Sequence, residues 1–378
     1  MKPCIVLCAN TSWYLYNYRQ ATIAALQQQG YQVICVAPSD AYSQRLQEAT
    51  GADYHELKMD NQGSHPLSDA LLMLRLWRLY RKLRPSVVLH FTIKNNLYGT
   101  LAASLLGIPA VNNVSGLGTA FMHAGITQQI VRLLYRVSQP RAFAVFCQNS
   151  EDHDFLIRED LVPAQKLRRI PGSGVDIERF SPRPISKPEA RPFRFLFLGR
   201  MLKDKGVYEL IEAFTRLQQS QPAELWLVGF SDAANNSAIG AQQLKQWDSL
   251  PGITWFDATD QPEEFLAQSD CLVLPSYREG LPRSLLEAGA MQIPVIACNV
   301  PGSRQVVEHG RTGLLCAPAD SDSLHQALLE MSTTDANQRQ QMGIAARQHV
   351  AENYSQQLVV TEYLAAITAA LAEDNQAI

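Results

Sequence analysis

Three kinds of sequence feature are missing from this chain of 378 residues. Its seven cysteines form neither a C-x-x-C pair nor a metal-knuckle spacing, so we expect no disulfide framework and no structural metal. The first apolar run, Cys4–Ala9, is ended by polar residues, and nothing in the sequence is typical of a secretory signal or a membrane span. No G-x-G-x-x-G motif follows that run, which argues against a dinucleotide-dependent oxidoreductase. We therefore expect a cytosolic protein of another class.

Charge is unevenly distributed along the chain. Residues 1–150 carry 13 Lys and Arg against 6 Asp and Glu, a net charge of +7. Residues 151–378 carry 20 against 30, a net charge of −10. Nucleic acid is a weak explanation of the basic first part, because no nucleic-acid motif is present and the isoelectric point is about 6.3. We expect no nucleic-acid partner.

Buried-strand patterns alternate with helical patterns, which predicts an α/β protein of helix-covered parallel sheets. Residues 181–192 contain four prolines and little apolar surface, which is typical of a linker. We expect two doubly wound domains, residues 1–182 and 183–355, and a helix within 356–378 that could pack on the first. The expected strands are Cys4–Ala9, Val33–Ala37, Ser86–His90, Ala110–Asn112 and Ala142–Cys147 before the linker, then Phe193–Leu198, Leu225–Val228, Ile253–Phe256, Cys271–Leu274 and Val295–Ala297 after it.

The turn after the first strand of the second domain carries two cations. Arg200 and Lys205 lie beside an expected helix start, whose free N–H groups also favour anions. This arrangement suits a diphosphate. A solvated basic turn is an equally good explanation of these residues alone.

A second turn in that domain carries two glutamates, Glu279 and Glu287, on either side of a helix start at Pro282. Glu287 lies in an apolar stretch, so a buried carboxylate there needs a partner, and a ribose diol is a candidate. The alternative is a glutamate that faces solvent.

Together these two turns resemble the signature of the retaining GT-B glycosyltransferases of family four, which use nucleotide-sugar donors. The resemblance covers essentially the whole chain and implies two Rossmann-like domains that face a central cleft. Arg200 and Lys205 match the pair that binds the donor diphosphate, Glu287 the ribose contact, and Glu279 the glutamate at the donor sugar. The resemblance also implies donor contacts from Gly199, Gly280 and Leu281.

Three turns of the first domain are candidate acceptor or sugar sites. The first contains Asn17, Arg19 and four aromatics but lacks the Gly-Gly pair of many relatives, and it suits a sugar or a packing cluster. In the second, the resemblance implies that His90 faces the cleft as a catalytic residue with Lys94 nearby, although a structural histidine is common. The third contains Ser115, Gly116 and Gly118, and its glycines permit close backbone approach to a sugar or form a plain turn.

The third turn, with Phe91–Lys94, is similar to a narrower group of transferases. These extend polyprenyl-diphosphate-linked sugars in bacterial surface-glycan and N-glycan assembly, such as the N-acetylgalactosaminyltransferases that act on undecaprenyl-diphosphate-linked bacillosamine. The resemblance implies retaining transfer of a hexose or N-acetylhexosamine from a UDP-sugar, without a cofactor. A soluble sugar or sugar-phosphate acceptor, and a nucleotide-sugar sensor without catalysis, stay open.

We expect no metal, since no D-x-D of the kind that holds a divalent ion in single-lobed transferases stands out. Arg200, Lys205 and helix dipoles would then meet the diphosphate charge. Two basic stretches, residues 68–84 and 128–141, combine Arg and Lys with aliphatic and aromatic residues. They predict contact with an anionic membrane surface, on the inner face of the cell membrane, although ordinary surface helices would also fit.

Overall fold

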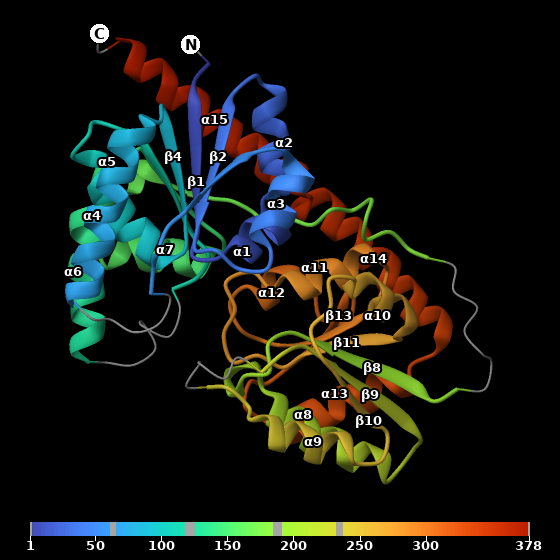
Figure 1. Ribbon diagram of the computed structural model, residues 1–378. Coiled ribbons are helices and arrows are strands. Elements are labelled where there is room, and N and C mark those ends of the chain that lie inside the picture. The colour runs from blue at the N-terminus through green and yellow to red at the C-terminus, as the bar shows by residue number, and fades with distance from the viewer. Residues whose placement is uncertain (1, 61–65, 118–124, 184–190, 232–236, 377–378) are drawn as a thin grey trace. The chain divides into compact units, whose positions relative to one another are not determined.

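The computed structural model describes residues 2–60, 66–117, 125–183, 191–231 and 237–376 (Figure 1). The chain divides into two compact units, which we call unit 1 and unit 2. Unit 1 contains Met1–Ser173 and Gln357–Ile378, and unit 2 contains Gly174–Gln356. Each unit is built on a parallel sheet, so the expected α/β architecture with two sheets is confirmed.

The sheet of unit 1 has seven strands in the order β3-β2-β1-β4-β5-β6-β7, all paired in parallel. The strands are β1 Cys4–Cys8, β2 Gln32–Ala37, β3 Asp53–Glu56, β4 Val87–Phe91, β5 Ala110–Val114, β6 Ala144–Cys147 and β7 Leu167–Arg169. The sequence patterns predict the five apolar inner strands but neither edge strand. β3 and β7 are short and mostly polar, so their apolar signal is weak.

Helices cover both faces of the unit 1 sheet. They are α1 Ser12–Tyr18, α2 Gln20–Gln28, α3 Ser43–Thr50, α4 Pro66–Leu83, the π-helical turn η1 Asn95–Gly99, α5 Thr100–Ser104, α6 Ile126–Ser138, α7 Ser150–Arg158 and α15 Gln356–Gln376. Because side chains alternate along a strand, Ile5 and Leu7 pack on one face with α2 and α15. Val6 and Cys8 pack on the other face with α4 and α5. The last helix therefore belongs to the core of unit 1.

The boundary between the units falls after Ser173, earlier than the expected boundary at residue 182. The segment that follows joins unit 2 because Val175 and Phe180 are wholly buried in its core. The guanidinium of Arg347 also donates to the carbonyls of Ile177 and Phe180. Of the expected linker, residues 184–190 lie outside the described residues.

Unit 2 has a six-stranded parallel sheet in the order β10-β9-β8-β11-β12-β13. Its strands are β8 Phe193–Leu198, β9 Ala223–Val228, β10 Ile253–Phe256, β11 Cys271–Leu274, β12 Val295–Cys298 and β13 Gly313–Cys316. Its helices are α8 Val207–Gln218, α9 Ala241–Asp248, α10 Pro262–Gln268, α11 Arg283–Ala290, α12 Ser303–Val306, α13 Ser321–Thr333 and α14 Ala336–Tyr354, and the 3-10 turn η5 spans Lys203–Lys205. The chain leaves β8 toward β9 on one side and later adds β11 on the other, so a topological switch point lies between β8 and β11.

Candidate active site

Three loops of unit 2 meet backbone to backbone at the carboxyl ends of its central strands. A Cβ built on Gly206, in the loop after β8, would lie 2.1 Å from the carbonyl oxygen of Pro275, which follows β11. A Cβ on Gly302, after β12, would lie 2.4 Å from the carbonyl oxygen of Gly280. Real Cβ atoms do not approach so closely, so glycine allows these loops to pack together. Both glycines also have a positive φ, +68° and +78°.

The expected diphosphate site lies on these loops at the switch point. Lys205 forms an ion pair with Glu279, so the ammonium and the carboxylate predicted at the donor are brought together. Arg200 is exposed on the loop that follows β8. Among the described residues, no side chain caps the first turn of α8, which follows Gly206, so its free N–H groups favour an anion. A diphosphate would compete with Glu279 for Lys205.

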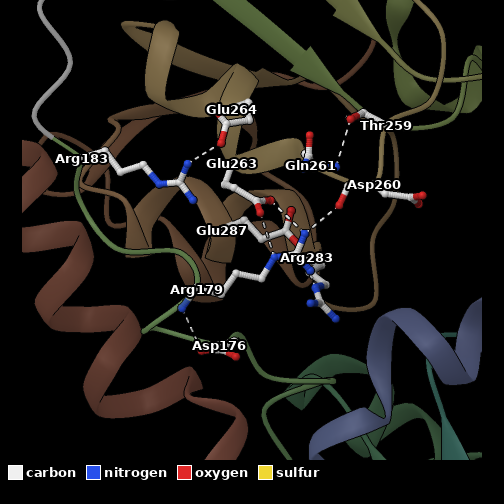
Figure 2. A network of polar contacts seen from close by, with 10 residues as sticks. All are labelled: Asp176, Arg179, Arg183, Thr259, Asp260, Gln261, Glu263, Glu264, Arg283 and Glu287. Atoms are coloured by element: carbon white, nitrogen blue, oxygen red, sulfur yellow. Dashed lines mark hydrogen bonds and ion pairs between the residues drawn. The ribbon is translucent and has the colours of Figure 1, made fainter. Parts of the chain in front are cut away.

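Glu287 is largely buried, with 8% of its surface exposed, and its partner is a residue of its own helix. Nε of Arg283 donates to Oε1 of Glu287 over 2.7 Å, one helical turn away (Figure 2). Burial raises the pKa of Glu287, and the neighbouring Arg283 and Arg179 oppose that rise. The expectation of a partner for this buried carboxylate is met by Arg283, and a ribose contact stays a prediction.

A second arginine–carboxylate pair lies beside Glu287. The guanidinium of Arg179 donates two hydrogen bonds to the carboxylate of Glu263, from Nε at 3.1 Å and from Nη2 at 2.8 Å (Figure 2). Its Nη2 also donates to the carbonyl of Asp260. Sequence reasoning missed Arg179, Glu263 and Arg283. The i, i+4 spacing of Arg283 and Glu287 could have revealed one contact, but nothing in the sequence links Arg179 to Glu263.

His90 does not face a cleft, which corrects the expectation of a catalytic histidine there. It is wholly buried, at the carboxyl end of β4 in unit 1. Its Nδ1 lies 2.9 Å from Oδ1 of Asn112, and its Nε2 lies 2.9 Å from the hydroxyl of Tyr80. Because an amide oxygen only accepts, Nδ1 carries the proton and Nε2 accepts from Tyr80. His90 is thus a structural residue, neutral and satisfied on both sides.

The buried His90 predicts a pH-dependent stability. Burial lowers its pKa to about 4, although the hydrogen bond with Asn112 works against that shift. The unfolded chain therefore takes up a proton near pH 6.5 that the folded chain refuses. We expect the free energy of unfolding to fall by up to about 1.4 kcal/mol per pH unit between pH 6.5 and 4. Denaturant titrations at several pH values measure this slope.

His90→Gln should reduce that slope, whereas His153→Gln, at a partly exposed histidine of α7, should leave it unchanged. An equal slope in wild type and His90→Gln would contradict the assignment of the slope to His90.

Two of the other predicted residues of unit 1, Lys94 and Asn17, have partners within that unit. Lys94 forms an ion pair of 2.9 Å with Asp69 of α4, and Nδ2 of Asn17 donates to the carbonyl of Trp13. Ser115 and Gly116 follow β5, and the hydroxyl of Ser115 is buried without a partner. Gly118 lies outside the described residues. Arg19 is wholly buried, and its contact with a sugar or an acceptor stays a prediction.

Within the described ranges, no group of three or more His, Cys, Asp or Glu is placed to hold a metal ion. The chain does contain two Asp-x-Asp triplets, Asp152–Asp154 and Asp320–Asp322. Asp152 accepts from the side chain of Asn149, the N-cap of α7, and Asp320 is itself the N-cap of α13. Both triplets begin helices in this structure.

The arginines of α6 both contact Glu159, and Arg136 is nevertheless exposed. Arg132 pairs with the carboxylate of Glu159 at 2.8 Å, and Arg136 donates to the carbonyl of the same residue. The exposed side of α6 combines Arg136 with large aliphatic side chains, with Ile126 78%, Ile130 51%, Leu133 61% and Val137 37% exposed. Exposed leucines also occur on α4, together with exposed basic side chains at Arg78, Arg81 and Lys82. None of the helices described is both long and apolar enough to cross a membrane.

Two family models match this chain, one for each unit. A model described as "Glycosyl transferase 4-like" matches residues 4–149, and one described as "Glycosyl transferases group 1" matches residues 179–349. The second match includes Arg200, Lys205, Glu279 and Glu287.

Relatives and solved structures extend over most of the chain. It is 24% identical to the Campylobacter jejuni N,N'-diacetylbacillosaminyl-diphospho-undecaprenol alpha-1,3-N-acetylgalactosaminyltransferase, over 93% of this chain and 94% of the relative. It is 28% identical to the Escherichia coli UDP-Gal:alpha-D-GlcNAc-diphosphoundecaprenol alpha-1,3-galactosyltransferase, over 70% and 71%. The structure of sucrose-phosphate synthase from Thermosynechococcus elongatus superposes with a TM-score of 0.81 and 18% identity, over 98% and 100%.

Proposed function

Because this chain belongs to the GT-B glycosyltransferases, with a glycosyl transferase 4-like domain and a group 1 domain, we propose that it transfers a hexose or N-acetylhexosamine from a UDP-sugar to a polyprenyl-diphosphate-linked sugar. We place this reaction in the assembly of a bacterial surface polysaccharide or related glycan. The names of two relatives support the acceptor class, and one of them also names a UDP-sugar.

The observation that carries the proposal is the set of side chains at the switch point of unit 2. Lys205 and Arg200 lie on the loop after β8, which also leads into the uncapped N-terminus of α8. Glu279 contacts Lys205, and Glu287 lies further along the loop and helix that follow β11. Two cations for a diphosphate, with carboxylates for sugar hydroxyls, are what a nucleotide-sugar donor needs.

In the proposed mechanism the donor diphosphate displaces Glu279 from Lys205 as it binds. Arg200, Lys205 and the N-terminus of α8 then stabilise the negative charge that grows on the departing phosphate. Glu279, once released, accepts hydrogen bonds from the donor sugar, and Glu287 accepts them from the ribose. The leaving phosphate oxygen takes the proton of the acceptor hydroxyl, which attacks from the same side, so the anomeric configuration is retained. The reaction so described uses no metal ion and no cofactor.

Transfer assays with purified protein test this function. A thermal-shift series with UDP-, GDP- and ADP-sugars identifies the donor, since a ligand that binds the folded state raises the unfolding temperature. That donor is then offered with an undecaprenyl-diphosphate-linked sugar or with soluble sugars and sugar phosphates. We expect transfer to the lipid-linked acceptor alone, without a divalent ion. Transfer to a soluble acceptor only, or donor binding with no transfer to either class, would overturn the proposal.

We further propose that the exposed side of α6 rests on the cytoplasmic face of the cell membrane, where a lipid-linked acceptor resides. Burying an exposed aliphatic side chain in the lipid interface is favourable by about 1.5–3 kcal/mol. Basic residues on α4 add attraction to anionic lipid.

Ile130→Glu should therefore lower binding to anionic liposomes by about tenfold or more. The matched control is Ile344→Glu, at an isoleucine of α14 that is 40% exposed. Sedimentation of both variants with vesicles of mixed neutral and anionic phospholipid measures the difference. Equal binding of Ile130→Glu and wild type would remove α6 from the membrane contact.

A further inference from the structure

Arg19 is a buried cation without an acidic partner among the residues that the structure describes. It begins the turn between α1 and α2 and is 0% exposed. Only Nη2 makes hydrogen bonds, to the hydroxyl of Tyr14 at 2.7 Å and to the hydroxyl of Ser173 at 3.4 Å. Nε and Nη1 are buried with no partner. A buried charge left in this state is costly, so a missing anion is the simplest counterpart.

Aromatic rings surround this guanidinium. Its central carbon lies 4.3 Å from the ring centre of Phe91 and 5.4 Å from those of Tyr14 and Tyr363. The ring of Tyr363, on α15, also stands at 5.2 Å from that of Phe146. Cation–π contacts offset part of the desolvation cost, but they give no partner to the N–H groups at the edge of the guanidinium.

Two more polar groups near these rings also lack partners. Asn113 on β5 is paired in register with Phe91 of β4 and Phe146 of β6, so its side chain is on the same face of the sheet as theirs. Asn113 is 0% exposed, and both polar atoms of its side chain are without partners. The hydroxyl of Tyr363 is likewise buried and unpartnered. Such groups are rare in native proteins, so each of them calls for a partner that the described residues do not supply.

We propose that Arg19, Asn113 and Tyr363 form an internal oxyanion pocket in unit 1 that takes a phosphoryl group. The guanidinium, the amide N–H groups and the phenol are all donors, and no carboxylate competes with them among the described residues. The pocket itself is independent of the proposed function. The assignment of the bound phosphoryl group to the diphosphate of the lipid-linked acceptor rests on that function. A polyprenyl diphosphate is the phosphoryl compound that unit 1 would meet.

Thermal unfolding in inorganic phosphate, pyrophosphate or chloride at equal ionic strength tests the pocket. All proteins in this experiment also carry Lys205→Met, so that anions bound at the proposed donor site of unit 2 contribute less to the unfolding midpoint. We expect phosphate or pyrophosphate to raise the unfolding midpoint by about 2–4 °C over chloride. Arg19→Met, Asn113→Leu and Tyr363→Phe should each remove most of that rise. Arg45→Met is the matched control, since Arg45 also lies over two aromatic rings, Tyr16 and Tyr42, but is exposed.

A purely structural Arg19 gives a different result. If Arg19 served the cation–π cluster alone, Arg19→Met would be destabilised, but phosphate would raise the unfolding midpoint of wild type and of Asn113→Leu by the same amount. An equal rise in these two proteins would overturn the pocket. Asn113→Leu keeps the test open if Arg19→Met does not fold.

Steady-state kinetics identify the source of the phosphoryl group. We expect Asn113→Leu to raise the KM for the lipid-linked acceptor about tenfold while the KM for the donor is unchanged. An intact anion response together with no transfer to lipid-linked acceptors would reject the proposed function but leave the pocket. Transfer to the lipid-linked acceptor without any rise of the unfolding midpoint in phosphate would support the proposed function but reject the pocket.

Discussion

Lys205→Met is expected to lower kcat for sugar transfer by about 100- to 1,000-fold, the usual loss when one preorganised electrostatic contact to a developing negative charge is removed. Lys205 lies at the switch point on the turn that leads into α8, and its ammonium already forms an ion pair there. Methionine keeps the length of the apolar stem but not the charge. The diphosphate would then lose one of its two expected cations.

Inhibition by nucleotides separates this role from a loss of folding. UDP should bind Lys205→Met less tightly than wild type, while UMP, which lacks the second phosphate, should bind nearly as well. Lys203→Met is the matched control, because Lys203 lies on the same 3-10 turn but is exposed. A Lys205→Met enzyme that bound UDP as well as wild type would remove Lys205 from the diphosphate site.

The sequence predicts the positions of the loops that carry Arg200, Lys205 and Glu279, because the signals of the flanking elements are local. The strand β8 and the helix α8 have clear apolar patterns, and the cations between them follow directly in the chain. Parallel strands put all their carboxyl ends at one edge of a sheet, so the turns after β8 and β11 had to come together. The pattern of alternating elements places both turns at this edge, whereas their roles at a donor came from the resemblance to glycosyltransferases and stay a prediction.

Contacts between residues far apart in the sequence could not be predicted in this way. The pair Arg179 and Glu263 depends on how the segment before β8 packs on α10, which no local pattern encodes. His90 illustrates the same limit, since a histidine after a strand looks alike whether it faces a ligand or a buried tyrosine. The ion pair of Arg132 with Glu159 is a further example, since the neighbours of Arg132 on α6 do not reveal it.

Gly302 packs closely against the loop that contains Gly280, and this contact allows a second test of the site. The test removes no functional side chain. In Gly302→Ala the new methyl group would lie 2.4 Å from the carbonyl oxygen of Gly280 and 2.8 Å from that of Glu279. The loop must shift, and Glu279 must shift with it. A displacement of about 1 Å at a reacting centre can cost about 100-fold in rate, so we expect a loss of that order in kcat/KM.

Gly310→Ala is a control for the positive φ. Gly310 has φ +77°, nearly equal to the +78° of Gly302, but no atom lies within 4 Å of a Cβ built on it. Both variants should lose stability from an alanine at positive φ. Gly302→Ala should lose more, because its φ of +78° and ψ of −54° lie in the strained γ-turn region and its methyl group meets a carbonyl oxygen. Only Gly302→Ala should lose transfer activity, because only its methyl group presses on the loop that carries Glu279. If both variants kept the same activity, the position of the Glu279 loop would not matter to the reaction, and the role of Glu279 at the donor sugar would have to be abandoned.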